Sequence, residues 1–437
     1  MYRLGELEAL VKHAARDAGF ELSGIAPVRE LPELAHFPPW IAAGRGGEMQ
    51  YLEARDETGR LKRASLRNVA PWARSVIVCA INYNTAEPYS TRFTDPERGW
   101  ISRYAWSRED YHESVMRRLR VVETKLREAV VDAEESSHSS LHGLAAGKRT
   151  HNPSMPADDS LLEAFPQTKT HDTPAAQRRQ TLAPRFSAGN APSGHNESPL
   201  GDDTNAIRMH PSADPTTALL TRCYVDTGPL VERVYAKYAG VGWIGKNTCI
   251  LNQQLGSWLF LGVILTSLDL APDLPAPDRC GTCTRCIDAC PTDALLAPYQ
   301  LDSNRCISYL TIEKRGELPE AMRAGLGRHV FGCDICQDVC PWNRKAPATE
   351  AEEFQPREGL VNPALAWLAE MSVEEFREKF RGSPIRRTKR NGLRRNAILA
   401  MGNSGDPTFL PLLQKLAGDE DQVIAESARW AAARLGG

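Results

Sequence analysis

Hydrophobic positions in the N-terminal part of the chain follow two spacings, one helical and one strand-like. Residues 4–20 place apolar side chains three and four positions apart, which predicts an amphipathic helix that stops near Gly19. Further helices are predicted at about 109–133 and at 230–239, and short apolar runs predict strands at 22–27, 75–82, 219–225 and 258–266. The pattern predicts one α/β (α+β) domain assembled from residues 1–135 and 217–270.

Residues 136–216 lose this periodicity. The segment is rich in Ser, Pro, His, Asn and Asp, contains nine of the 30 prolines and has no Trp or Tyr. Because so few apolar side chains cannot offset the entropy cost of ordering the chain, we predict a disordered low-complexity insertion. Six of the ten histidines lie here singly, which is typical of a solvated loop and not of a metal site.

Helical spacing returns near the C-terminus. Apolar positions recur from Leu393 to Met401, from Phe409 to Leu416 and from Val423 to Leu435, and a turn at 402–407 separates the first two groups. Short helices joined by turns at this interval are typical of an α-solenoid. We therefore predict a C-terminal α-helical HEAT-like repeat within residues 346–437.

Composition narrows the class of protein. With 42% hydrophobic and 25% charged residues, the 437-residue chain resembles a soluble globular protein of several domains. No run approaches the ~18 apolar residues of a membrane span, and the N-terminal pattern differs from an export signal, so we expect a cytoplasmic protein. The net charge of −2 excludes a global attraction to nucleic acid, so any such contact needs a local basic patch.

Cysteine spacing indicates the chemistry. Eight of the eleven cysteines lie between residues 280 and 340. The run 280–291 has the C-x2-C-x2-C-x3-C-P spacing of bacterial ferredoxins, in which three thiolates bind one [4Fe-4S] cluster and the fourth binds the other. The run 333–341 lacks a leading cysteine, which Cys306 can supply. The predicted ligand sets are Cys280, Cys283, Cys286 and Cys340 for one cluster, and Cys290, Cys306, Cys333 and Cys336 for the other.

Zinc and disulfides are the alternatives to iron–sulfur clusters. Four thiolates also suit zinc, but zinc sites usually pair two separated C-x2-4-C knuckles and lack the C-x3-C-P element. Disulfides need an oxidising compartment, for which the sequence has no export signal. We therefore predict a ferredoxin-like domain with two [4Fe-4S] clusters in residues 271–345, which indicates a redox protein.

Two further motifs have more than one interpretation. Gly240, Gly242 and Gly245 match the dinucleotide fingerprint, but a helix precedes them where a strand is required, so a Gly-rich loop against a bulky ligand is the alternative. Asp226 follows a predicted strand and precedes a helix. It is either a helix N-cap or a proton donor whose pKa an apolar pocket raises.

A cationic run lies at the start of the C-terminal helices. It consists of Arg386, Arg387, Lys389, Arg390, Arg394 and Arg395, and no Asp or Glu lies between Lys379 and Asp406. A solvated helix face is one interpretation of this run. The uncompensated charge favours the other, in which these residues follow a phosphate backbone.

Together these motifs resemble epoxyqueuosine reductases. The resemblance rests on the ferredoxin run and on six shorter motifs, which are Phe37–Arg45, Ser102–Trp106, Tyr224–Pro229, Gly242–Thr248, Ile307–Thr311 and Gly332–Asn343. It covers nearly the whole chain except residues 136–216. The insertion of about 80 residues departs from the family pattern, and the C-terminal region is long enough for only about two repeats.

The resemblance implies a substrate, a reaction and cofactors. The substrate would be tRNA with epoxyqueuosine at the wobble position, which a two-electron reductive deoxygenation converts to queuosine in the last step of queuosine biosynthesis. The clusters would pass electrons to a cobalamin held by the α/β domain, and the reduced cobalt would engage the epoxide carbon. Asp226 would protonate the epoxide oxygen, and Tyr104 with Lys246, Asn247, Thr248, Cys249 and Ile250 would contact the corrin. The helical repeat would hold the anticodon stem-loop.

Two other classes of protein share part of these motifs. A cobalamin-dependent reductive dehalogenase would act on a small molecule and would not need the cationic run. A ferredoxin-type electron carrier would leave Asp226 and the Gly-rich loop unexplained. We expect a monomer that receives electrons from a separate donor, which the sequence does not identify.

Overall fold

The computed structural model describes residues 5–145 and 219–436 of the chain. Residues 5–139 and 219–436 belong to one compact unit, and residues 140–145 begin a second unit.

Thirteen α-helices and ten strands are present in the described residues. The helices are α1 (Glu6–Asp17), α2 (Phe37–Ala42), α3 (Tyr111–Ala145), α4 (Glu232–Tyr238), α5 (Arg285–Asp288), α6 (Ile307–Ile312), α7 (Glu320–Arg323), α8 (Ile335–Asp338), α9 (Leu365–Glu370), α10 (Val373–Lys379), α11 (Lys389–Ser404), α12 (Leu410–Leu416) and α13 (Gln422–Arg434). The strands are β1 (Leu22–Pro27), β2 (Ser75–Asn82), β3 (Trp100–Ile101), β4 (Thr221–Tyr224), β5 (Trp243–Ile244), β6 (Ile250–Leu251), β7 (Leu259–Thr266), β8 (Leu295–Ala297), β9 (Gln300–Leu301) and β10 (His329–Phe331).

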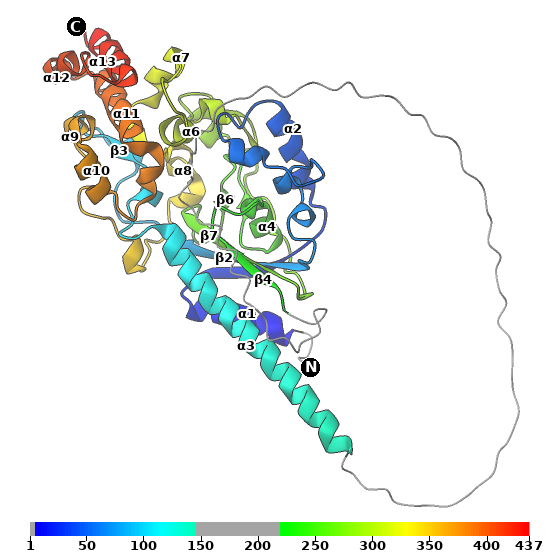
Figure 1. The fold of residues 1–437 in the computed structure, drawn as a ribbon. Coiled ribbons are helices and arrows are strands. Elements are labelled where there is room, and N and C mark those ends of the chain that lie inside the picture. Colours follow the sequence, from blue (N-terminus) through cyan, green and yellow to red (C-terminus); the bar gives the residue numbers. More distant parts are fainter. Residues whose placement is uncertain (1–4, 146–218, 437) are drawn as a thin grey trace, which may run out of the picture. The chain divides into compact units, whose positions relative to one another are not determined.

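The main sheet has the strand order β1-β2-β7-β4, and every neighbouring pair is antiparallel. Both faces of β2 are buried, because Ile77 and Ile81 face the core under α1 and α3 while Val76 and Val78 face the core under α4. Figure 1 shows α1 and α3 on one side of this sheet and α4 on the other. Because the main sheet contains no parallel pair of strands, the domain is of the α+β class and not of the α/β class.

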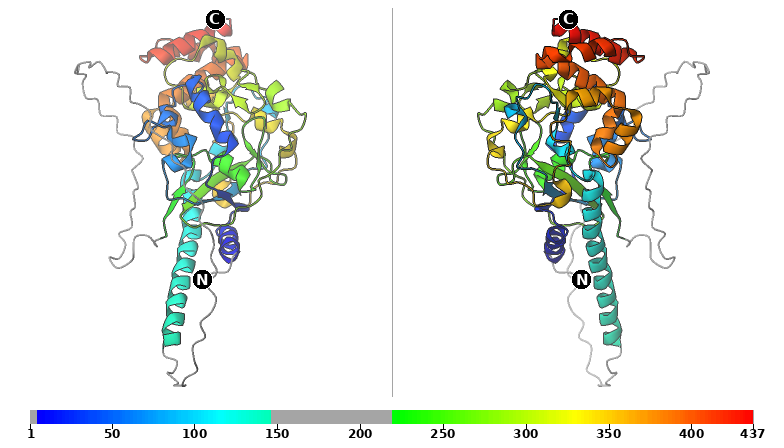
Figure 2. Two further views of the ribbon diagram at one scale, coloured as in Figure 1. Left: turned by 90° about the vertical axis from the view of Figure 1, so that its right-hand side faces the viewer. Right: turned by 90° about the vertical axis from the view of Figure 1, so that its left-hand side faces the viewer.

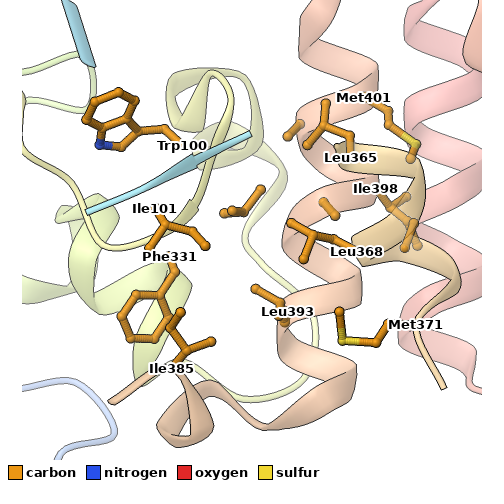
Figure 3. Packing of buried hydrophobic residues seen from close by; sticks show 14 of the residues in the cluster. Trp100, Ile101, Phe331, Leu365, Leu368, Met371, Ile385, Leu393, Ile398 and Met401 are labelled. Atoms are coloured by element: carbon orange, nitrogen blue, oxygen red, sulfur yellow. The ribbon is translucent and has the colours of Figure 1, made fainter. Parts of the chain in front are cut away.

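The C-terminal helices share a core with a segment from the first quarter of the chain. Trp100 and Ile101 of β3 pair in parallel with β10, and both strands face α9 and α11. Figure 3 shows Ile101 on the side of Leu368 and the ring of Phe331 beside Ile385, within the same cluster. Helices α11–α13 lie at the opposite end of the unit from α1 (Figure 2). The polypeptide thus returns to its own N-terminal part to complete this core.

Most predicted elements of the N-terminal part are confirmed. The structure contains the predicted helix near residues 4–20 and strands at or within the four predicted runs. The turn-rich segment 37–52 was predicted to end in a helix. This prediction is wrong, because the α-helix of the segment, α2, lies at its start, where Pro38 and Pro39 fit the first turn.

The prediction placed the start of the insertion too early in the chain. Residues 136–145 continue α3 instead of forming a loop. Proline interrupts helices, and residues 136–145 contain none. The next proline in the sequence is Pro153. The remaining part of the predicted insertion, 146–216, lies outside the described residues.

The three predicted C-terminal helices are confirmed as α11, α12 and α13. Two more, α9 and α10, precede them in a region for which the sequence pattern indicated only mixed polar character. The assignment of these helices to a HEAT-like repeat stays a prediction, as do the domain boundaries at 270 and 345. None of the described helices is long and apolar enough to cross a membrane.

Candidate active site

Asp226 lies just beyond the end of β4, in a backbone conformation that Asp rarely adopts. Its φ of 58° places it in the left-handed region. The residue before α4 is Val231, so Asp226 does not cap that helix and the N-cap interpretation is wrong. Its side chain is 65% exposed, which corrects the expectation of a largely apolar pocket. The carboxylate is therefore presented to solvent by a strained turn.

Two side chains from the first turn of α3 approach this carboxylate. The Tyr111 hydroxyl donates a hydrogen bond to Asp226 Oδ2 at 2.8 Å, and His112 Nε2 lies 3.8 Å from the same oxygen. His112 Nδ1 lies 2.7 Å from Asp110 Oδ1. Asp110, His112 and Asp226 thus form a line of groups that can hold and move protons.

The pKa values of Tyr111 and Asp110 are shifted in opposite directions. Burial, together with the charge of Asp226, raises the pKa of Tyr111 well above its usual range, so this phenol stays a hydrogen-bond donor. Burial alone would raise the pKa of Asp110, but the hydrogen bond and the charge of His112 outweigh it and lower the pKa. The ionised form of Asp110 is therefore available to His112 Nδ1 as a hydrogen-bond acceptor.

Aromatic and charged side chains from distant segments surround the carboxylate. Tyr104 packs edge-on against Tyr111, and burial and the charge of Asp226 raise its pKa well above the usual value. Arg387 forms an ion pair with Glu313 and lies over the Tyr51 ring, 5.3 Å from its centroid. Its electrostatic interaction with Asp226 places the predicted cationic run beside the candidate active site.

Glu232, in the first turn of α4, has a carboxyl oxygen without a partner. Its Oε1 atom is buried and accepts no hydrogen bond within the described residues. Burial and the neighbouring charge of Asp226 raise the pKa of Glu232 to about 7. A buried acceptor of this kind can receive a polar hydrogen from a bound ligand.

The Gly-rich loop forms a short hairpin of β5 and β6. A side chain at Gly242 would place its Cβ 2.4 Å from the Leu251 carbonyl oxygen, so only glycine fits where the two strands meet. No helix follows the three glycines, which is a second departure from the dinucleotide-binding arrangement. The glycines therefore serve the tight approach of two strands.

The tip of this hairpin, residues 245–249, contacts both cysteine runs. Lys246 Nζ donates to the carbonyl oxygens of Gly281 and Cys283, at 2.6 and 3.0 Å. Asn247 is buried and donates to the Cys336 carbonyl at 3.3 Å. The Cys249 thiol is hydrogen-bonded to that of Cys336. The side chains predicted to contact a corrin are thus largely engaged with the cysteine-bearing segments.

Two other residues of the predicted loop are placed differently. Ile250 is buried under the sheet, in the core that α4 covers. Thr248 has a φ of 65°, and its carbonyl oxygen accepts a hydrogen bond from Arg233 at 2.9 Å. Arg233 follows Glu232 in α4, so Thr248 connects the hairpin to the Asp226 side of the molecule.

The first predicted set of four cysteines lines one small cavity. Its volume is about 40 Å³, and Cys280, Cys283, Cys286 and Cys340 all face it. Burial and the nearby thiols of Cys280 and Cys286 raise the pKa of Cys340 to about 11. The last cysteine of the second run therefore lies with the first three of the first run.

The second predicted set joins a cysteine of the first run with cysteines of the second run. Burial, with the thiols of Cys306 and Cys290 nearby, raises the pKa of Cys333 well above its usual value. A hydrogen bond with Cys249 and burial raise the pKa of Cys336, and Cys333 and Cys306 add to the effect. The structure thus brings Cys290 to the second set, as the crossed wiring of such motifs requires.

All eleven cysteines are described, and the structure contains no disulfide among them. Within the described residues, no group of three His, Cys, Asp or Glu side chains is arranged to hold a single metal ion. The preference for iron–sulfur clusters over zinc therefore rests on the ferredoxin spacing and on the grouping of Cys340 with Cys280, Cys283 and Cys286.

A buried carboxylate fixes the second cysteine run to the N-terminal part of the chain. Asp334 is 1% exposed and accepts hydrogen bonds from the Ser102 hydroxyl, the Trp100 indole and the backbone amide of Arg103. These three donors lie within four consecutive residues, 100–103, so one side chain fixes that whole segment. The motif containing Tyr104 is therefore held against the cysteines.

The cationic run is only partly exposed. Arg386, Arg387 and Lys389 are exposed and Arg390 is half-buried. Arg394 is buried and pairs with Asp419, and Arg395 is 1% exposed and donates to the carbonyl oxygens of residues 310, 314 and 316. The prediction that these last two face a nucleic acid is wrong, because carbonyl groups and one carboxylate of the protein bind both guanidinium groups.

Sequence reasoning missed several residues at this site. Tyr111, His112 and Glu232 were not singled out, nor was Tyr51. Tyr111 lies 115 positions from Asp226, and no spacing rule relates a helix start to a strand end across that separation. For Tyr111 and His112, the one local signal was their position a few residues after the Ser102–Trp106 motif.

Comparisons with known proteins agree with this geometry. Residues 279–343 match the family model described as "4Fe-4S double cluster binding domain", and residues 63–138 match the one described as "Epoxyqueuosine reductase QueG, DUF1730". An epoxyqueuosine reductase of Synechocystis sp. is 35% identical over 86% of this chain and 98% of its own length. One from Xanthomonas campestris is 32% identical, over 98% and 96% respectively.

A solved structure is similar to this chain over nearly its whole length. It is the crystal structure of an epoxyqueuosine reductase with an epoxyqueuosine-modified stem loop of tyrosine tRNA. The similarity covers 99% of this chain and 91% of the other, with a TM-score of 0.69 and 26% sequence identity. The similarity in fold therefore extends over nearly the whole chain.

Proposed function

The chain belongs to the epoxyqueuosine reductase family, and on this premise we propose that it reduces epoxyqueuosine to queuosine in tRNA. One observation supports the proposal most directly. The exposed Asp226 carboxylate, with Tyr111 and His112 behind it, lies in the same compact unit as eight cysteines grouped for two clusters. A proton donor and an electron relay are the two functions that a reductive deoxygenation requires.

The reaction consumes two electrons and two protons. Both carbon–oxygen bonds of the epoxide break, a carbon–carbon double bond forms and the oxygen leaves as water. Since a [4Fe-4S] cluster transfers one electron at a time, two transfers complete one turnover. We assign Cys280, Cys283, Cys286 and Cys340 to one cluster and Cys290, Cys306, Cys333 and Cys336 to the other.

Residues near Asp226 fit a large polar cofactor, and cobalamin is the one we propose. The unpartnered Oε1 of Glu232 and the partly buried ring of Tyr104 provide a polar and an aromatic contact for it. Tyr104, Asp226 and the 246–250 hairpin tip would hold it, with Lys246 and Asn247 contributing backbone and not side-chain contacts. When bound, cobalamin supplies a low-valent cobalt nucleophile, which no side chain can replace.

Asp226 donates the proton to the epoxide oxygen in this proposal. Tyr111 orients the carboxyl group through its hydrogen bond to Oδ2. His112, held by Asp110 on its other nitrogen, returns a proton to Asp226 after each turnover. The exposed position of the carboxylate suits a substrate as large as a tRNA, whose reacting base must reach it from solvent.

The exposed cations beside this site would bind the tRNA backbone. Arg386, Lys389 and Arg390 extend from Arg387, which already interacts with Asp226. Phosphate contacts of this kind position a nucleic acid without reading its bases. A tRNA substrate places the protein in the cytoplasm, and one chain contains every proposed ligand, so a monomer suffices.

Nucleoside analysis tests the proposed function. The protein is purified anaerobically, reconstituted with iron, sulfide and cobalamin, reduced, and incubated with tRNA that contains epoxyqueuosine. We expect the modified nucleoside to lose the mass of one oxygen atom, as measured by mass spectrometry. Unchanged nucleoside after reconstitution of both clusters would refute the assignment.

A further inference from the structure

A cavity of about 900 Å³ lies on the cysteine-bearing part of the molecule and takes no part in the site above. One wall is the loop 84–92, and the opposite wall comes from α5, α8 and residues 344–348. Its volume is within the range of ligand-binding clefts, about 300–1,000 Å³. None of its lining residues belongs to the Asp226 site, so the two surfaces can be occupied at the same time.

The cavity borders the first cysteine set directly. Arg285 lines both this cavity and the small one between Cys280, Cys283, Cys286 and Cys340. Two more lining residues, Ala289 and Val339, directly precede Cys290 and Cys340. A redox group placed in the cavity would therefore face the helices that hold the cluster ligands.

Three arginines at this cavity lack carboxylate partners. Arg92, Arg285 and Arg344 are exposed, and no ion pair to any of them occurs within the described residues. The exposed carboxylates of the lining are Glu87 and Asp288, and Asp288 already accepts a hydrogen bond from Thr284. The accessible charge of the cavity is therefore positive, and it is available to an acidic surface.

Two buried oxygen atoms in the same lining have no partner. Asn84 Oδ1 and Asp338 Oδ1 belong to side chains that are 4% and 7% exposed, and neither atom accepts a hydrogen bond within the described residues. Buried acceptors usually have partners, so these two indicate a wall shaped for an incoming donor group. The free arginines and the unpartnered acceptors are independent indications of a binding surface.

The loop that forms one wall is held rigidly. The Arg103 guanidinium is buried and donates to the carbonyl oxygens of Thr85, Glu87 and Pro88. It also lies between the rings of Tyr89 and Trp258, 5.4 and 5.2 Å from their centroids. A preformed surface loses little conformational entropy on binding.

We propose that this cavity is the docking site of an acidic one-electron carrier protein with an iron–sulfur or flavin group. The inference rests on the proposed function, which requires two electrons from outside the molecule. Two reduced carriers dock in turn, and each is oxidised by one electron that enters the cluster of Cys280, Cys283, Cys286 and Cys340. Small interfaces suffice for such transient redox encounters, and charge complementarity sets their association rates.

Cluster reduction without substrate tests the docking site. A reduced [2Fe-2S] ferredoxin of strongly negative net charge is mixed with the cluster-loaded protein, and absorbance follows electron transfer in a stopped-flow instrument. We expect a second-order rate that falls as ionic strength rises. The variant R92E/R285E/R344E should react about tenfold or more slowly at low salt. Because no tRNA is present, the outcome does not depend on whether epoxyqueuosine is the substrate.

Three controls make the test specific. The variant R16E/R377E/R381E has the same charge change on exposed positions that do not line the cavity and should keep the wild-type rate. Reduced methyl viologen, a small cation that needs no docking, should reduce R92E/R285E/R344E at least as fast as wild type. R92E/R344E leaves the neighbour of Cys286 intact and should still react several-fold more slowly with ferredoxin.

Three results would overturn the proposal. One is an unchanged ferredoxin rate in R92E/R344E. Another is an equal loss of rate in R16E/R377E/R381E, which would indicate a general charge effect. The last is a loss of tRNA stem-loop affinity in R92E/R344E with an unchanged ferredoxin rate, which would make this surface a nucleic-acid contact.

Discussion

At the scale of single residues, Asp226 depends on side chains remote from it in sequence. Its backbone has a strained φ of 58°, and Tyr111 and His112 lie against its carboxylate. A backbone in this region costs of order 1–3 kcal/mol and persists only where the surroundings enforce it. The strain is consistent with a carboxylate that is presented to a substrate and does not stabilise a helix.

Replacing this carboxyl group should abolish most of the turnover. We expect Asp226→Asn to lower the single-turnover rate of epoxide reduction about 100-fold or more, since general acid catalysis contributes roughly that much. Tyr111→Phe, which keeps the acid and removes one hydrogen bond, should cost only about tenfold. Both variants should keep their iron content. Full activity of Asp226→Asn would exclude the role of proton donor.

Glu232 should make stability depend on pH. Burial raises its pKa from 4.5 to about 7, so between these values the folded protein holds a proton that the unfolded chain releases. Stability is therefore greatest below pH 4.5 on account of this group, and it declines as pH rises through 7. We expect Glu232→Gln to raise the unfolding temperature by about 1–3 °C at pH 8.

The same substitution should have little effect at low pH. At pH 5 the wild-type carboxyl is largely protonated and resembles the amide, so the two unfolding temperatures should nearly coincide. Thermal unfolding of the cobalamin-free protein, followed by circular dichroism at both pH values, measures the difference. An equal gain at both values would show that ionisation of Glu232 is not its cause.

At the scale of elements, two four-residue helices, α5 and α8, lie within the two cysteine runs that provide all the proposed ligands except Cys306. Helices α5 and α8 each contain one cysteine and are followed within two residues by another. Cys340 at the end of the second run lines the cavity of the first set. The two runs therefore exchange their last ligands, and neither forms a complete set alone.

This exchange predicts the result of paired cysteine substitutions. Cys340→Ser should leave about half the iron per chain, because it removes the cluster of Cys280, Cys283 and Cys286 and keeps the other. Adding Cys283→Ser should cause no further loss, whereas adding Cys333→Ser should remove nearly all the iron. Iron analysis and electron paramagnetic resonance of the reduced protein measure both effects.

One substitution outside the two sets serves as the control. Cys79 is fully buried in the main sheet, and burial raises the pKa of its thiol to about 12, so Cys79→Ala should keep both clusters. If Cys340→Ser and Cys333→Ser together lost only half the iron, the crossed assignment would be wrong.

At the scale of the whole molecule, segments far apart in sequence form one core and one site. Trp100 and Ile101 pack with Phe331 and with the C-terminal helices, and Arg387 from the helical region interacts with Asp226. Figure 3 shows Trp100, Ile101 and Phe331 on one side of this core and residues of α9 and α11 on the other. The C-terminal helices are therefore placed to bring cations to the active site.

This arrangement predicts which cations bind tRNA. We expect R386E/K389E to weaken binding of a tRNA stem-loop about tenfold or more, and to lower the salt dependence of log K by roughly 1 to 2. The variant R429E/R434E changes two exposed cations of α13 and should bind as wild type does. Fluorescence anisotropy at two or more salt concentrations measures both quantities. Equal affinities for R386E/K389E and wild type would remove the run from the proposed interface.

Local patterns in the sequence were enough to predict many of the elements and the chemistry of the cysteines. Side chains on one face of a strand recur every second residue and those on one face of a helix about every 3.6 residues, so these spacings indicate which residues are buried. The ferredoxin spacing indicates which cysteines bind the clusters. For that reason β2, β7 and α11 and the burial of Cys79 follow from residues close together in sequence, whereas the two ligand sets follow from the crossed-ligand rule of the ferredoxin motif.

The tertiary structure decided what depends on long-range contacts. Arg394 and Arg395 resemble their exposed neighbours in composition, and only the packing of α11 against Asp419 and the 310–316 carbonyls makes them internal. Tyr111 and His112 became partners of Asp226 because α3 begins where β4 ends in space. Contacts between residues far apart in sequence produce no repeating pattern along the chain, so the side chains around Asp226 could not be predicted. The cysteine sets could be predicted because they follow a known ligand-spacing motif.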